Sequence, residues 1–419
     1  MDQKKFGKNI LKEIFLDHWE SFKEHYGSYD CDQYNVPVEK MLNCLDASQG
    51  YACYVCESCG DQRRVSFSCK SSFCLSCSKL YSEDVVHEVS RSLHGGINYL
   101  HIVLTVPSQL RTVFYNYRSD GKFLSEFIKV AYNTVSEVIK RTESRELLVG
   151  VIGVVHTHGR SGSYNPHVHL LVSQGGLDSL KVRWYELKFL PYGLLNKLWQ
   201  KLLCSFLIKS VGESINDLIV ELQSKYKEGF VCNVSGKKAP ISHLKSLKKY
   251  LAKYLSSPPI SARRILSYDG EWVLYCYKDH KSKKLKKEKV RVFQFIGRLV
   301  QHIRVKGFQK IRYYGIQATR SYQKVKASIM KSLSRIGRKV SDVLDFNLLR
   351  SWRDRFFSMT GKDPLVCNNC GGVMSLWYLW SRRNGVFYDV YGNAPLVQER
   401  SSPIDIKEID KRSLQLQLF

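Results

Sequence analysis

Two histidines separated by one apolar residue constrain this chain more than any other feature. His167 and His169 lie in the apolar run of residues 165–172, whose composition predicts a buried β-strand. Because successive side chains of a strand point to opposite faces, both imidazoles face one way while Val168 and Leu170 face the core. Two imidazoles on one face of a strand supply half of a metal site.

A second apolar segment upstream carries two more histidines. Residues 151–158 include His156 and His158, and the Gly/Ser-rich residues 159–163 join the two segments, which predicts a β-hairpin. Pairing would bring His156 or His158 beside the first two histidines and leave coordination positions for a phosphate oxygen and water. A lone strand histidine is usually a packed or surface group, but four on facing strands favour a metal site, since buried unpaired imidazoles are costly to desolvate.

The net charge of the chain indicates the sign of its partner's charge. Its 419 residues carry a formal net charge of +27, far more than solubility requires, so we expect a polyanionic partner, with nucleic acid first. RNA-binding modules, ribosomal scaffolds and proteins at anionic membranes share such charge. No apolar run reaches 18 residues and the N-terminus has no hydrophobic signal core, so we expect an intracellular protein without a membrane partner.

The cysteines predict zinc rather than disulfides. Eight of the 13 precede residue 78, and the odd total without a secretion signal argues against a disulfide framework. Two knuckles, Cys56-x-x-Cys59 and Cys74-x-x-Cys77, are separated by 14 residues, a spacing that lets them offer four sulfurs to one Zn²⁺. Cys69 is the alternate ligand.

Five further cysteines have weaker interpretations. Cys53 also lies close enough to substitute in the zinc site, whereas Cys31 and Cys44 read as ordinary thiols. The pair Cys367 and Cys370 has no partner pair nearby in the sequence. It is either half of a metal site or a turn with two free thiols.

Two tyrosines stand four residues apart on a predicted helix. Residues 242–257 have an apolar stripe, a serine at the expected N-cap and two prolines just beyond their end. Tyr250 and Tyr254 would share one helix face, amid Lys249 and Lys253. A tyrosine pair at this spacing is more often packing than chemistry. Beside a metal-bound phosphate, however, a phenol flanked by lysines is a plausible nucleophile.

Periodicity predicts the remaining elements. We expect helices over 8–24, 81–93, 123–141, 192–210, 213–225 and 324–338, strands over 97–106 and 229–234, and a hairpin with an Asp-Gly turn over 264–277. Residues 278–289 are expected to form a lysine-rich loop. Basic residues in this loop and elsewhere are candidates for contact with the nucleic-acid backbone: Lys249, Lys253, Arg263, Arg264, Lys283, Lys284 and Arg312. A second tyrosine pair, Tyr313 and Tyr314, is not expected to be catalytic, because adjacent residues point to different sides of a helix or strand.

With these motifs, the chain resembles the HUH rolling-circle insertion-sequence transposases, which have two tyrosines and an N-terminal zinc ribbon. The resemblance covers roughly residues 30 to 375 and rests on motifs in the family's order: CESC (56–59), SCKSSFCLSC (68–77), HTHGR (156–160), NPHVH (165–169), YLAKYLSSPPI (250–260), FIGRL (295–299) and IRYYG (311–315). His158 departs from the pattern, because the family often has an aromatic residue there. Lys253 stands where arginine is common, which keeps the charge but loses the bidentate fork.

The resemblance implies tyrosine cleavage of one DNA strand with Mg²⁺ or Mn²⁺, and single-stranded transposition intermediates. It implies that His167, His169 and a third histidine are metal ligands, with His156 preferred to His158 as the third. It implies Tyr250 and Tyr254 as the nucleophiles. It also implies a protein of the bacterial cytoplasm, associated with the nucleoid.

The expected fold is α+β. We expect an N-terminal helix and zinc-binding domain over 1–93, an antiparallel-sheet HUH nuclease over 94–290, a basic DNA-gripping helical region over 291–375 and a tail over 376–419. Two other functions use similar features. A replication initiator or relaxase would share the chemistry, and a zinc-ribbon binding protein would use the histidines and tyrosines only structurally.

Overall fold

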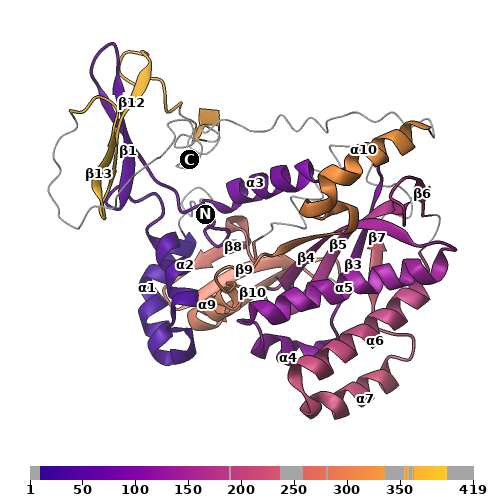
Figure 1. Ribbon diagram of the computed structural model, residues 1–419. Coiled ribbons are helices and arrows are strands. Elements are labelled where there is room, and N and C mark those ends of the chain that lie inside the picture. The colour runs from indigo at the N-terminus through magenta and orange to yellow at the C-terminus, as the bar shows by residue number, and fades with distance from the viewer. Residues whose placement is uncertain are drawn as a thin grey trace.

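The chain folds as a mixed α+β protein in which three antiparallel sheets are joined by helices (Figure 1). The structure, a computed structural model, describes residues 10–187, 190–235, 258–279, 282–335, 353–354, 356–357, 361 and 363–393. The predicted helix with Tyr250 and Tyr254, together with Lys249 and Lys253, lies outside the described residues. Within them, no helix is long and apolar enough to cross a membrane.

The largest sheet lies mostly in the region predicted to be the nuclease domain. Its order is β11-β4-β5-β3-β7, with β6 paired to β5, and every pairing is antiparallel. The strands are β3 (Tyr99–Thr105), β4 (Leu147–His158), β5 (Tyr164–Asp178), β6 (Trp184–Glu186), β7 (Cys232–Ser235) and β11 (Ile311–Tyr314). The histidine hairpin is confirmed: β4 pairs with β5, and the Gly159 N–H donates to the Ser163 carbonyl (2.9 Å) in the turn.

One face of this sheet packs on a layer of helices. These are α4 (Arg111–Asn116), α5 (Gly121–Thr142), α6 (Tyr192–Val211) and α7 (Asn216–Lys225). Asp120 caps α5 by accepting hydrogen bonds from the backbone N–H groups of Lys122 and Phe123. Val168 and Leu170 are fully buried on this face, as their alternation with the histidines requires.

The opposite face is covered along only part of its length. Helices α3 (Ser78–Arg91) and α10 (Thr319–Arg335) pack on Tyr99, Ile152, Val154 and Leu171. Because strand parity puts the histidines on this same face, the apolar positions lie beneath the two helices and the imidazoles lie further along the strands. The partial cover leaves this end of the sheet for a site.

A second body contains the N-terminal helices. Helices α1 (Ile10–His25), α2 (Asp32–Leu42) and α9 (Val292–Val300) share a core with the three-stranded sheet β10-β9-β8, made of β8 (Ile265–Tyr268), β9 (Trp272–Lys278) and β10 (Leu285–Arg291). The expected loop over 278–289 is therefore partly wrong, because Leu285–Arg291 is a strand. Its lysines mark an exposed edge strand, a place where charge prevents further pairing.

The third sheet joins the two ends of the chain. Its order is β13-β12-β1-β2, with β1 (Gly50–Cys56), β2 (Gln62–Ser66), β12 (Met374–Ser381) and β13 (Gly385–Asp389). The expected regions 291–375 and 376–419 are thus divided differently: β11 belongs to the largest sheet and β12 spans their boundary. Long-range strand pairing is the reason, since it leaves no local signal. Five short 3₁₀ turns complete the described elements: Gly27–Tyr29, Ser108–Leu110, Glu213–Ile215, Ala262–Arg264 and Gly315–Gln317.

Candidate active site and metal centres

Three of the four predicted histidines meet at the open end of the largest sheet. His156 on β4 lies directly opposite His167 on β5, and His169 follows two residues later on the same face. One ring nitrogen from each of the three lies within 4.8 Å of the other two, a spacing at which a single ion could take all three as ligands.

Hydrogen bonds orient these rings as a metal site requires. His167 Nδ1 bonds the Asn165 carbonyl oxygen (2.7 Å), and His169 Nδ1 bonds His101 Nε2 (2.9 Å). Such partners fix which ring nitrogen faces a metal ion. His156 Nε2 is buried with no hydrogen-bond partner among the described residues, a cost that coordination would remove. These residues therefore fit a divalent ion.

Burial keeps the imidazoles in the form that binds metal. Desolvation lowers the pKa of His156 and His169 well below the ordinary value, and also lowers the pKa of His167. A neutral imidazole keeps the lone pair that coordinates a cation.

His158 lies outside the three-histidine group. A register shift between His156 and His158 interrupts the pairing of β4 with β5, so equal parity along the strand does not place the two rings equivalently. The His158 ring stacks on the outer side of this group, 5.1 Å from the ring of His156 and 5.6 Å from the ring of His302, measured between centroids.

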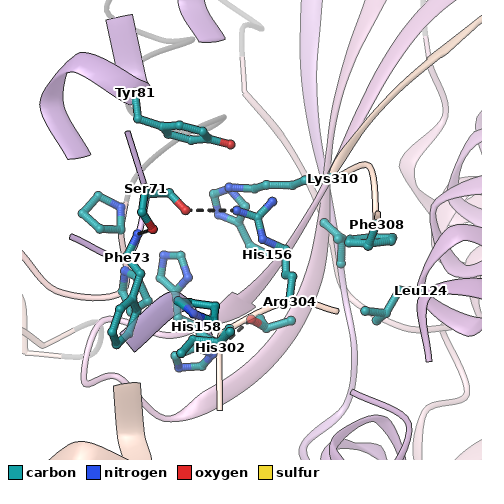
Figure 2. A pocket seen from close by; sticks show the side chains of 17 residues that line it. Ser71, Phe73, Tyr81, Leu124, His156, His158, His302, Arg304, Phe308 and Lys310 are labelled. Carbon is teal, nitrogen blue, oxygen red and sulfur yellow. Dashed lines mark hydrogen bonds between the residues drawn. The ribbon is translucent and has the colours of Figure 1, made fainter. Parts of the chain in front are cut away.

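A cavity of about 320 Å³ opens beside the histidines (Figure 2). His156, His158 and His302 lie on its wall, together with the guanidinium group of Arg304 and the buried amine of Lys310. Burial lowers the pKa of Lys310 well below its usual value, with Arg304 adding repulsion. Such a cavity suits a phosphate group beside a metal site.

Sequence reasoning missed three residues of this region. His101 stands in the predicted strand 97–106 on the face that carries the other histidines, so its parity was an available signal. His302 and Lys310 follow the helix α9 in irregular segments, where no periodicity locates them.

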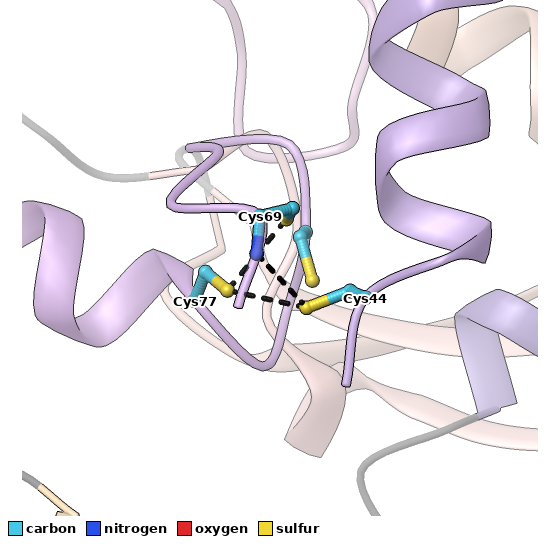
Figure 3. Close-up of side chains that lie close together, drawn as sticks. Cys44, Cys69 and Cys77 are labelled. Carbon is cyan, nitrogen blue, oxygen red and sulfur yellow. Dashed lines mark hydrogen bonds between the residues drawn. The ribbon is translucent and has the colours of Figure 1, made fainter. Parts of the chain in front are cut away.

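The cysteines form two separate four-sulfur groups rather than the predicted one. Cys74 and Cys77 lie with Cys44 and Cys69 (Figure 3), and their thiols approach closely, at 3.4 Å from Cys44 Sγ to Cys77 Sγ. The structure thus joins the alternate ligand Cys69 to one knuckle. Cys44, expected to be an ordinary thiol, belongs to the same group.

The other knuckle has a distant partner. Cys56 and Cys59 lie with Cys367 and Cys370, so the expected set of Cys56, Cys59, Cys74 and Cys77 is not brought together. The physical reason is the β1–β12 pairing, which carries the C-terminal pair to the tip of the first hairpin. Cys53 is buried inside β1 and belongs to neither group.

The candidate DNA-binding residues that the structure describes form two sets, one exposed and one hydrogen-bonded within the protein. Arg263, Lys283 and Lys284 are exposed. Arg264 donates to the carbonyls of Arg160, Pro259 and Cys276, and Arg312 donates to Ser125 Oγ (2.9 Å). These two guanidinium groups hold segments of the protein together, whereas the exposed three are placed to meet solvent.

Comparison with known proteins identifies the class. A family model of transposase zinc-binding domains matches residues 14–106, and one described as a putative transposase matches residues 150–324. The transposase for insertion sequence element IS801 of Pseudomonas savastanoi pv. phaseolicola is 29% identical over 328 residues, which are 74% of this chain and 76% of that protein. The putative transposase y4qJ of Sinorhizobium fredii (strain NBRC 101917 / NGR234) is 23% identical over 374 residues, 86% and 92% of the two chains. No solved structure matches.

These matches define a DNA transposase, an enzyme that acts on DNA. More specifically, the chain belongs to the IS91 family of rolling-circle insertion-sequence transposases with an N-terminal zinc-binding domain. The zinc-binding match and the cysteine groups support structural Zn²⁺. The resemblance recognised from the motifs is confirmed, and the binding-protein and initiator alternatives are not the class to which the chain belongs.

Proposed function

We propose that this transposase cleaves and rejoins single-stranded DNA through a 5′-phosphotyrosine intermediate, with Tyr250 and Tyr254 as nucleophiles. The phenolic oxygen attacks a phosphodiester phosphorus, the bond from phosphorus to the 3′ oxygen breaks, and that oxygen takes up a proton. Because the phosphodiester energy stays in the tyrosine linkage, a second 3′-hydroxyl can reverse the step without ATP. Two tyrosines permit two successive transfers, as rolling-circle movement of an insertion sequence needs.

The three-histidine group carries this proposal. His156, His167 and His169 would hold Mg²⁺ or Mn²⁺, which when bound neutralises the charge that develops on the scissile phosphate. His167 and His169 keep their rings oriented through Asn165 and His101. Lys310 and Arg304 would bind neighbouring phosphate oxygens in the cavity.

Chain connectivity supports convergence of the tyrosines on this group. The segment that carries them leaves the described structure at Ser235, which pairs with His101 in the sheet, and re-enters it at Pro258 in the cavity wall. Tyr254 is four residues from Pro258, so their Cα atoms lie within about 14 Å of each other. Both ends of the segment therefore adjoin the histidines.

In this proposal, exposed basic groups bind the DNA backbone and zinc stabilises the fold. Arg263, Lys283 and Lys284, with Lys249 and Lys253 of the tyrosine segment, would contact phosphates without reading sequence. Cys44, Cys69, Cys74 and Cys77 would bind structural zinc, because tetrahedral thiolate sites hold small domains together. Such an enzyme would act at the nucleoid, in the bacterial cytoplasm, where its DNA substrate lies.

The proposal is tested by trapping the covalent intermediate. Full-length protein is incubated with a 5′-labelled or 3′-labelled single-stranded oligonucleotide of the element's end, with Mn²⁺, Mg²⁺ or EDTA. We expect a denaturant-resistant adduct that carries only the label 3′ of the cut, that needs the divalent ion and that does not form on the same sequence as duplex. Tight binding without an adduct at any end sequence would refute the proposed chemistry.

A further inference from the structure

The second cysteine group lies where the two ends of the chain meet. In the β13-β12-β1-β2 sheet, Cys56 is the last residue of β1 and Cys59 lies in the turn that follows it, and Cys367 and Cys370 precede strand β12. Between the two knuckles, the Cys56 and Cys370 sulfurs lie 3.4 Å apart and the Cys59 and Cys367 sulfurs 3.7 Å apart, and all four sulfurs lie within 4.8 Å of one another. None forms a disulfide, whose S–S bond would be about 2.05 Å.

The two knuckles have matching backbone geometry. Each has the sequence Cys-x-x-Cys-Gly, and Gly60 and Gly371 adopt φ of +73° and +74°. The Gly60 N–H donates to the Cys56 carbonyl (3.0 Å), and the Gly371 N–H donates to the Cys367 carbonyl (3.1 Å). Positive φ favours glycine, so both knuckles are preset as tight turns that aim two sulfurs at one point.

Further contacts extend this pseudo-symmetry. The N–H of Cys56 donates to the Asp61 carbonyl (2.8 Å), and the N–H of Cys367 donates to the Gly372 carbonyl (2.9 Å). One cysteine of each knuckle is buried and the other is exposed. Backbone N–H groups of Asn369 and Gly372 donate to sulfurs (3.4 Å each), an arrangement that stabilises thiolates.

Among the residues that the structure describes, little else holds the sheet around this group together. Its buried side chains fall into two small clusters, one on each face: Ala52, Tyr54, Cys56, Val65, Cys367, Met374 and Leu379, and Tyr51, Cys53, Tyr378 and Trp380. A sheet with so small a core usually needs a disulfide or a metal ion. Four converging thiols supply the ligands that Zn²⁺ prefers in structural sites.

We infer that Cys56, Cys59, Cys367 and Cys370 form a second structural zinc site, which fastens the C-terminal hairpin to the N-terminal one. The ion joins residues 308 positions apart, Cys59 and Cys367, and completes a ribbon whose two halves come from opposite ends of the chain. The matched zinc-binding family segment, residues 14–106, contains all of the first cysteine group but only half of this one.

The first test counts zinc in purified full-length protein by plasma mass spectrometry. Cys367→Ser/Cys370→Ser is expected to lose one zinc per chain relative to the native protein. Cys53→Ala, which alters a buried cysteine of the same sheet outside the group, is expected to lose none. Zinc bound elsewhere contributes equally to the native protein and to both variants, so the difference between their zinc counts reports on this site alone. An unchanged count in the double variant would overturn the inference.

A second test uses the unmodified protein, in case the variants fold poorly. Cys59 and Cys370 are exposed, as is Cys31, which belongs to neither group. With N-ethylmaleimide and peptide mapping, Cys31 should be labelled at once, whereas Cys59 and Cys370 should be labelled only after a chelator removes zinc. Rapid labelling without chelator would overturn the inference. So would protection that a reductant removes and a chelator does not, since that result means a disulfide.

Discussion

Replacing both proposed nucleophiles, Tyr250→Phe/Tyr254→Phe, is expected to abolish the covalent DNA adduct while single-stranded DNA still binds within a few-fold of the native affinity. Phenylalanine keeps the ring but has no oxygen to attack phosphorus, so no residual chemistry remains at these positions. Each single variant keeps one phenol and should lose one of the two transfers. The measurement is denaturing electrophoresis of the labelled DNA after reaction with Mn²⁺.

The matched control is the second tyrosine pair of the chain. Tyr313 and Tyr314 lie on β11, and the Tyr314 ring stacks on Tyr132 at 4.4 Å between centroids. Because phenylalanine preserves that packing, Tyr313→Phe/Tyr314→Phe should form the adduct normally. An adduct that persists in the first double variant and disappears in this one would move the nucleophile to β11 and contradict our assignment.

Replacing His169 with alanine is expected to reduce strand cleavage about a thousandfold, equivalent to roughly 4 kcal/mol of lost transition-state stabilisation. His169 is one of the three clustered ring donors, and its loss leaves two ligands for the ion. DNA binding should change little, because phosphate contacts by exposed basic residues supply the affinity. The measurement is the rate of adduct formation at saturating DNA over a range of Mn²⁺ concentrations.

His101 gives a graded comparison. It bonds His169 Nδ1 and is not one of the three clustered donors, so we regard it as a positioning residue. His101→Phe should weaken metal binding about 10- to 100-fold and should be rescued by higher Mn²⁺. If His101→Phe and His169→Ala respond identically to added Mn²⁺, or if His169→Ala cleaves at the native rate, the assigned roles are wrong.

The sequence was sufficient for those parts of the fold that depend on local periodicity. The histidine hairpin follows from alternation around His167 and His169 and from the Gly/Ser-rich turn, and the structure confirms it. Helix α1 was expected over 8–24 and spans Ile10–His25, and helix α5 was expected over 123–141 and spans Gly121–Thr142. In each, an apolar stripe at helical spacing packs into a core.

Long-range pairing set the limit of sequence reasoning. Cys56 and Cys74 are close in sequence, so spacing favoured one shared zinc site, whereas strand pairing gives Cys56 a partner 314 residues away in Cys370. The strand Met374–Ser381 was missed for the same reason. The sequence predicts a loop where the structure has the strand Leu285–Arg291, because the lysines of this edge strand hide its alternation of apolar and polar residues.

The three-histidine group shows both outcomes. Motif and parity predicted His156, His167 and His169 as ligands, and the structure brings these three together, but parity alone left His158 as an equal candidate. The register shift that separates His156 from His158 depends on the turn and on the neighbouring strands, and a residue count does not reveal it. The contribution of His101 likewise depends on β3 pairing beside β5.

The most direct test of the account is an anomalous-difference map of crystals that contain the transposase, Mn²⁺ and a single-stranded end oligonucleotide. We predict one manganese peak bonded to ring nitrogens of His156, His167 and His169, with the scissile phosphate on the ion and the hydroxyl of Tyr250 or Tyr254 in line with its phosphorus. No peak among these histidines, or a peak there with both hydroxyls remote from the bound phosphate, would contradict it.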